Sequence, residues 1–327
     1  MVDALARLLE EGRYARCLFA AEQVMEQGGL SPVEQAGIHL IMSRCQLLLQ
    51  DAPAAVRSAL AAVKLAEQER EFDLLGRALL TLGAGHAALQ QHEQALNCFH
   101  RYFLHRAYYR EAARLEGAAW KSLGITYQRL LQPQAALHAL EAARAWFAGR
   151  RMEHGVFTTT HDLINVYLYL AREDAAWRRP ARRLLLGQRS IASRHPGEPY
   201  YLGTYLLDLA AWLIRGGYPG RAAVAAARAL NVYRGDPAHA CHCYLLLAQC
   251  ELQFGEGRQA LSFVLAALSE AVTAGLPELE HLAVDALNEL VEREGVQILR
   301  HLDAAYQATV HFPEEMPSVP LLRRDLQ

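Results

Sequence analysis

Residues 117–148, GAAWKSLGITYQRLLQPQAALHALEAARAWFA, limit what this chain can fold into more than any other stretch. The first half places Trp120, Leu123, Gly124 and Tyr127 at intervals of three, one and three residues. On a helix these side chains share one face, which has a gap at the glycine. The pattern therefore predicts a helix that a second helix approaches closely.

The second half of the stretch predicts that partner helix. After a turn at 132–133 it carries Ala136, Leu140 and Ala143 at intervals of four and three residues, so small side chains face the gap. Together the two halves resemble the tetratricopeptide repeat (TPR), whose signature is Trp, Leu, Gly and Tyr on the first helix and Ala, Phe and Ala on the second. Leu140 replaces the usual aromatic residue, and the proline expected at the end of the unit is missing.

The same helix–turn–helix pattern recurs with a period of roughly 40 residues. Units are expected to begin near Ala4, Ser31, Phe72, Gly117, Glu153, Tyr200, Pro237 and Leu276. Because each unit buries its apolar face only against its neighbours, we predict an all-α, right-handed superhelical solenoid of about eight TPR-like helical hairpins over residues 1–309. The last helix pair is expected at 276–293 and 296–309. The loop 194–199 predicts a weak hinge, and residues 310–327 form a proline-rich tail that cannot be helical throughout.

Composition narrows the cellular context and the partners. A formal net charge of -2 and a pI of about 6.7 argue against general nucleic-acid binding, because phosphate contacts require a basic surface. The N-terminus lacks an apolar signal segment, and no run of about 18 apolar residues predicts a membrane span. The six cysteines lie within helical patterns, which is typical of reduced thiols. We therefore expect a cytoplasmic protein without membrane partners.

The densest set of metal-ligand residue types is His239, Cys241, His242 and Cys243, with Cys250 further along. His239, His242 and Cys243 share a helical face. A structural zinc site usually takes four ligands in paired clusters, however, and no second cluster has matching spacing. We therefore interpret the cysteines as packing residues and the histidines as helix-start residues, and we predict no metal and no other cofactor.

Catalytic motifs are also missing from the sequence. There is no phosphate-binding loop of the GxxxxGK[ST] type and no HExxH motif, and the histidines have no Ser or Asp at triad spacing. Solenoids seldom enclose the water-excluding pocket that acid–base chemistry prefers. The arginine-rich run 178–183 is interpreted as a solvated helix face, with a site for an acidic partner, phosphate or RNA as the alternative. Pro180 within it predicts a helix that is kinked or starts late.

The resemblance to the TPR implies that certain residues of the first helices face a concave groove. Counted from the signature positions, they are Arg44; Lys121, Gln128 and Arg129; Asn165, Tyr169 and Arg172; Tyr205, Asp208 and Trp212; and Gln249 and Gln253. Amides pair with a peptide backbone, arginines with carboxylates, and aromatic rings with apolar side chains. Trp212 is the contact with the clearest physical reason, because a large aromatic side chain on a groove is costly unless something covers it.

The long period resembles the repeat domains of bacterial peptide-pheromone receptors and of large bacterial transcription regulators. We therefore expect a non-enzymatic scaffold or adaptor that binds a protein or peptide segment in its groove. One alternative is a ligand-responsive signalling sensor or regulator of the peptide-receptor type, and a second is a metal-dependent or other enzyme. The sequence is also compatible with a homo-oligomer, and the tail 311–327 would then lie either in the groove of its own chain or in that of a neighbouring copy.

Overall fold

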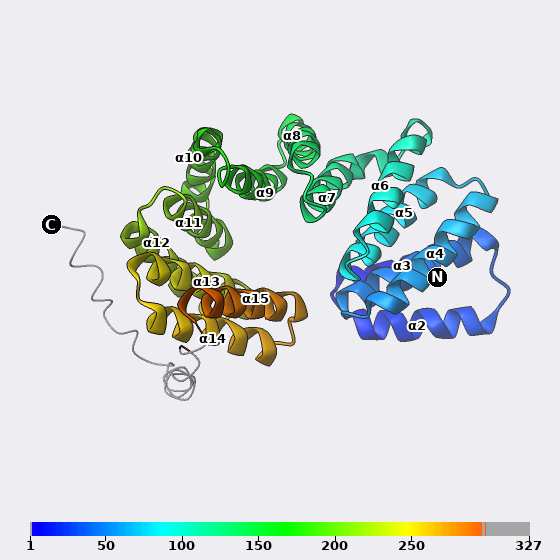
Figure 1. Cartoon of the computed structure of the whole chain (residues 1–327). Coiled ribbons are helices and arrows are strands. Elements are labelled where there is room, and N and C mark those ends of the chain that lie inside the picture. Colours follow the sequence, from blue (N-terminus) through cyan, green and yellow to red (C-terminus); the bar gives the residue numbers. More distant parts are fainter. Residues whose placement is uncertain (1, 296–297, 299–327) are drawn as a thin grey trace. The chain divides into compact units, whose positions relative to one another are not determined.

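The computed structural model describes residues 2–295 and residue 298 (Figure 1). Over these residues the chain forms fifteen α-helices and three short 3-10 segments, and no strand. The chain divides into two compact units, residues 1–159 and 160–327, and the boundary falls inside helix α9. The expected cap helix at 296–309, apart from residue 298, and the tail 310–327 lie outside the described residues.

The first unit is a series of helical hairpins that begins with a short helix. Its helices are α1 (Val2–Glu10), α2 (Tyr14–Gln27), α3 (Pro32–Leu48), α4 (Ala52–Gln68), α5 (Phe72–Ala88), α6 (His92–His105), α7 (Glu116–Arg129), α8 (Pro133–Gly149) and the start of α9 (Glu153–Leu170). From α1 to α8, successive helices contact each other, and α3, α5 and α7 also contact one another in turn. The first helices of the hairpins therefore form one layer and the second helices another.

The second unit continues the pattern from α9. Its further helices are α10 (Arg178–Arg194), α11 (Pro199–Ile214), α12 (Pro219–Val232), α13 (Pro237–Phe254), α14 (Gly257–Thr273) and α15 (Pro277–Glu294). As in the first unit, α11, α13 and α15 contact each other in turn. The late start predicted around Pro180 is confirmed: α10 begins at Arg178, after the 3-10 segment Ala175–Trp177, and Pro180 lies in its first turn, where the missing N–H has no helical partner to lose.

Local chemistry explains where the helices begin and end. Ser31 and Glu34 form a capping box at the start of α3, with Pro32 at the first helical position. The tight turns of the first unit depend less on glycine than the sequence suggests. Leu131, between α7 and α8, has a φ of 55°, and four other non-glycine turn residues share this left-handed conformation. The amide of Gln132 donates to the carbonyl of Tyr127 at 2.9 Å, which closes the α7 end.

The signature residues of the central stretch do what their spacing predicts. A Cβ atom at Gly124 would lie 2.6 Å from Leu140 Cγ and 3.2 Å from the Leu140 backbone nitrogen, so α8 approaches α7 at the glycine. Leu140 and Ala136 are fully buried in this contact. The Trp120 ring lies against Phe103, with 4.1 Å between ring centroids. These side chains pack one hairpin on the next, as the pattern predicts.

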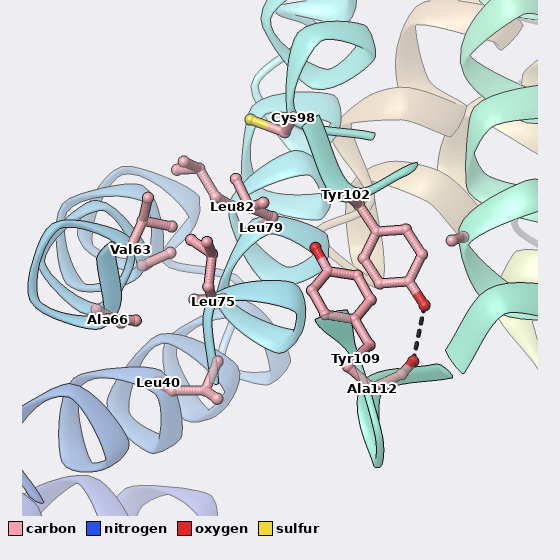
Figure 2. Packing of buried hydrophobic residues seen from close by; sticks show 14 residues of the cluster. Leu40, Val63, Ala66, Leu75, Leu79, Leu82, Cys98, Tyr102, Tyr109 and Ala112 are labelled. Atoms are coloured by element: carbon pink, nitrogen blue, oxygen red, sulfur yellow. Dashed lines mark hydrogen bonds between the residues drawn. The ribbon is translucent and has the colours of Figure 1, made fainter. Parts of the chain in front are cut away.

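A cluster of buried hydrophobic side chains lies around α5 in the first unit (Figure 2). Leu75 and Leu79 of α5 pack against Val63 of α4, and Tyr102 of α6 closes the other side. The Tyr102 hydroxyl donates to the carbonyl of Ala112 at 2.7 Å, and its burial raises its pKa. This bond fixes a connection that the repeat pattern does not predict, the irregular segment between α6 and α7 that contains the 3-10 turns Arg106–Tyr108 and Ala112–Leu115.

Candidate partner-binding face

Most of the expected binding residues lie in the second unit, on α9, α11 and α13, which are the first helices of successive hairpins. The His161–Asp208 hydrogen bond joins α9 to α11, and the side-chain amide of Gln253 on α13 donates to the carbonyl of Ile214 on α11 at 3.3 Å. The contacts thus bring α9, α11 and α13 side by side. We call the following residues the first-helix face: Asn165, Tyr169, Arg172, Tyr205, Trp212, Gln249 and Gln253.

A buried carboxylate organises this face. The Asp208 side chain is 2% exposed; its Oδ1 accepts a hydrogen bond from His161 Nδ1 at 2.7 Å, and its Oδ2 accepts one from Gln188 Nε2 at 2.7 Å. A neutral imidazole that donates from Nδ1 can accept at Nε2, which lies 3.2 Å from Asn165 Nδ2. The Asn165 amide therefore donates to His161, and its oxygen has no hydrogen-bond partner among the described residues.

The position of Asp208 corrects the expectation that this residue lines an open groove. The sequence spacing places it on the same helical face as Tyr205 and Trp212, yet its carboxylate is buried and engaged from two other helices. A buried charge is retained only where polar groups replace its lost hydration. Asp208 thus holds His161, and through it Asn165, in place.

Trp212 is half-buried and already partly covered. Its Nε1 donates to the carbonyl of Arg178 at 3.1 Å, and the Arg178 guanidinium lies over its ring at 4.7 Å from the centroid. The apolar side of the ring packs on the core around α11 and α12. Arg178 therefore covers much of the aromatic surface that the sequence predicts to be exposed on the groove.

Cationic side chains gather where α9 and α11 end. Arg172 lies two residues after the end of α9, and its guanidinium lies over the ring of Tyr169 at 5.5 Å from the centroid. Arg215 follows α11, and partial burial lowers its pKa, with a further lowering from the positive charge of Arg172 and an opposing effect of Glu289 on α15. The ends of these first helices therefore present positive charge beside aromatic surface.

The remaining expected residues differ in exposure. In the second unit Tyr205 is half-buried, whereas Gln249 and Gln253 are exposed on α13. In the first unit, Arg44 of α3 is exposed, Lys121 and Gln128 of α7 are half-buried, and Arg129 is exposed at the end of α7. Helix α5 contacts both α3 and α7 and therefore separates Arg44 on α3 from Lys121, Gln128 and Arg129 on α7.

The histidine and cysteine set of α13 is engaged in packing. Cys241, Cys243 and Cys250 are buried, and burial raises the pKa of their thiols to about 11, 12 and 12. His239 stacks on Tyr233 with 4.0 Å between centroids, and its Nδ1 lies 2.7 Å from Asp236 Oδ2. Over residues 2–295, no group of three or more His, Cys, Asp or Glu residues is arranged to hold a metal ion.

A hollow of about 300 Å³ lies at the turn between α12 and α13. Its lining comes from Gly235, Asp236, Pro237 and Ala240 and from the end of α14, Glu270, Thr273 and Ala274. It shares no residue with the first-helix face, and the side chain of its Asp236 forms a hydrogen bond with His239.

Across the described helices, none is both long and apolar enough to cross a membrane.

The arrangement of paired helices in successive, mutually contacting layers defines an all-helical repeat protein. No protein-family model and no curated protein matches the sequence. Solved structures do resemble it: the apo form of the quorum sensor NprR from B. thuringiensis has a TM-score of 0.62 and 11% identity, over 94% of this chain and 96% of that chain. NprR in complex with its cognate peptide NprX gives 0.61 and 11%, over 94% and 97%.

A tetratricopeptide repeat protein from Parabacteroides merdae ATCC 43184 has a TM-score of 0.60 and 13% identity, over 86% of this chain and 97% of that chain. At such identities the likeness concerns the fold. The chain therefore has the TPR-like α-solenoid fold, and the all-α solenoid predicted from residues 117–148 is confirmed.

Sequence reasoning missed four residues of this region: His161, Gln188, Arg178 as the cover of Trp212, and Arg215. Two of them carry a detectable signal. His161 lies four residues before Asn165 and therefore on the same helical face, and Arg215 lies three residues after Trp212. Gln188 gives no such signal, because it belongs to a second helix and reaches Asp208 through the hairpin interior.

Proposed function

We propose that this chain is a binding module that captures a peptide or protein segment on the first-helix face of its second unit. The observation that supports this most directly is the Asn165 amide, which His161 and Asp208 hold in one orientation. A side chain fixed in advance loses little rotamer entropy when it binds. Its unpaired oxygen suits a backbone N–H, and the rings of Tyr169 and Trp212 offer aromatic surface to apolar side chains.

The structural likeness adds support of a weaker kind. NprR, whose chain aligns with 94% of this one, was solved with its cognate peptide. The sequence identity of 11% carries no residue across, so the proposal depends on the residues of the first-helix face themselves.

The test uses an array of random-sequence octapeptides incubated with the full chain, followed by affinity measurements on the peptides that bind. Asn165→Ala removes the fixed amide, and we expect it to weaken binding about fivefold, the equivalent of one hydrogen bond of about 1 kcal/mol. Gln249→Ala on the same face should weaken binding in the same direction. Gln259→Ala, an exposed glutamine on the second helix α14, is the matched control and should have no effect.

Circular dichroism must show the same helical content for all three variants. If the Asn165→Ala and Gln249→Ala variants bind every selected peptide as tightly as the unaltered chain, the first-helix face is not the binding surface. If no peptide on the array binds the unaltered chain, peptide capture itself is contradicted.

A second function is a ligand-responsive sensor, which is favoured by the likeness to a quorum sensor solved both without and with its peptide. A sensor requires that the ligand bind two conformations of the chain with different affinity. Small-angle scattering with and without a selected peptide separates the two functions. An adaptor keeps its radius of gyration, whereas a sensor changes it; the same data report any self-association.

A further inference from the structure

Three arginines lie where α9 and α11 end and where α10 begins, and Glu289 on α15 acts on one of them, Arg215, from beyond ion-pair distance. Arg172, Arg178 and Arg215 form no ion pair with any described carboxylate, and their guanidinium groups donate no hydrogen bond to a described residue. We call these three residues the arginine cluster. A guanidinium group offers five N–H donors in a planar fork, so the cluster holds many donors that only solvent or a ligand can satisfy.

Contacts in the second unit bring the cluster together. Arg172 and Arg215 each follow the C-terminus of a first helix, and the two helices are joined at His161 and Asp208. The Arg178 guanidinium abuts Gly216, the residue after Arg215, at a place where a Cβ atom would collide with it. Burial lowers the pKa of Arg215, the nearby positive charge of Arg172 lowers it further, and Glu289 opposes both effects.

Aromatic rings hold two of these arginines in place. Arg172 lies over Tyr169 and Arg178 over Trp212. Stacking on a ring positions a guanidinium and leaves its edge, which carries the N–H donors, available to a planar anion. A cluster of like charges is unfavourable in the free protein, and a negatively charged ligand relieves this repulsion on binding.

We propose that the arginine cluster selects an acidic peptide segment, whose aspartate or glutamate carboxylates pair with Arg172 and Arg215 beside Trp212. The carboxylate is planar and accepts two parallel N–H bonds from one guanidinium, which matches the donors available here. This proposal rests on the proposed capture of a peptide by the first-helix face, and it adds the charge of the partner. The segment lies with its backbone at Asn165 and its acidic residues toward the ends of α9 and α11.

The experiment uses pairs of octapeptides of the same random sequence, one with Asp and Glu and the other with Asn and Gln at the same positions. The full chain should bind the acidic member at least tenfold more tightly. The Arg172→Gln/Arg215→Gln variant should bind both members equally, and Arg172→Lys/Arg215→Lys should retain part of the preference. Arg228→Gln, an exposed arginine on α12, is the matched control and should keep the full preference.

Each outcome decides between the two proposals. Peptide binding without an acidic preference, or a preference that survives in the Arg172→Gln/Arg215→Gln variant, overturns the acidic selectivity and leaves peptide capture intact. No binding of either member contradicts both. A polyuridylate RNA that displaces the acidic peptides and depends on the same two arginines would overturn the choice of partner, because the cluster would then be a phosphate site.

Discussion

Replacing Gly124 by alanine tests whether close approach of α7 and α8 sets the packing of the first unit. The added Cβ atom would lie 2.6 Å from Leu140 Cγ and 2.8 Å from Leu140 Cδ2, both closer than van der Waals contact. Leu140 is 0% exposed, and its backbone nitrogen would lie only 3.2 Å away, so rotation of the side chain alone cannot make room. Helix α8 must move.

Two opposing effects determine how much Gly124→Ala changes the free energy of unfolding. Alanine in place of glycine inside a helix stabilises by about 1 kcal/mol through propensity, and overpacking of a filled interface destabilises by about 1–3 kcal/mol. The matched control is Gly37→Ala in α3 of the same unit, because the added Cβ would meet only Val2 Cγ1 at an ordinary 3.8 Å. Gly37→Ala should stabilise, whereas Gly124→Ala should be less stable than it by about 1–3 kcal/mol.

Native-state hydrogen exchange read by mass spectrometry is the suitable assay, because repeat proteins can open one region at a time. The opening free energy of α7 and α8 should fall in Gly124→Ala relative to Gly37→Ala, while α3 and α4 change less. Circular dichroism should show the same helical content for both variants. Equal opening free energies of α7 and α8 in the two variants would refute the close-approach argument.

Three further predictions concern the second unit. The Cys243 thiol, whose pKa burial raises to about 12, should not react with Ellman's reagent at pH 8 until the chain is denatured. Burial raises the pKa of Glu251 from 4.5 to about 6, so its contribution to stability is fully present below pH 4.5 and falls by about 2 kcal/mol in all as the pH rises through 6 to about 7. Urea titrations across that range should show the loss in the unaltered chain and not in Glu251→Gln. Asp208→Asn should destabilise the second unit by about 1.5–3 kcal/mol in the same titrations at pH 7, because it weakens charge-assisted bonds to His161 and Gln188; no change would contradict a structural role for the carboxylate.

The fold was accessible from sequence because its main determinant is local. Gly124 and Leu140 meet across one hairpin, only 16 positions apart, and the spacing of small and large residues records that contact directly. The same spacing of small and large residues predicted both helices of each hairpin up to α15. It did not locate the segment between α6 and α7, which is held by Asp73: its Oδ1 accepts hydrogen bonds from the backbone amides of Arg110 and Ala112 at 2.8 and 2.9 Å. Those partners lie 37 and 39 positions from Asp73, far beyond the spacing of neighbouring helical turns, and no periodic pattern records them.

The binding face was accessible only in part, and Asp208 shows the physical reason. Helical periodicity assigns a residue to a face about 100° wide, which includes both the exposed centre and the buried edge of that face. Whether a carboxylate at the edge is solvated or buried depends on donors from elsewhere, here His161 from the preceding hairpin and Gln188 from the second helix of that hairpin. Burial without both donors would leave part of the charge unsolvated, so the three residues act as one unit. A change in Gln188 should therefore reach the first-helix face through Asp208 and His161, although Gln188 itself is buried between helices.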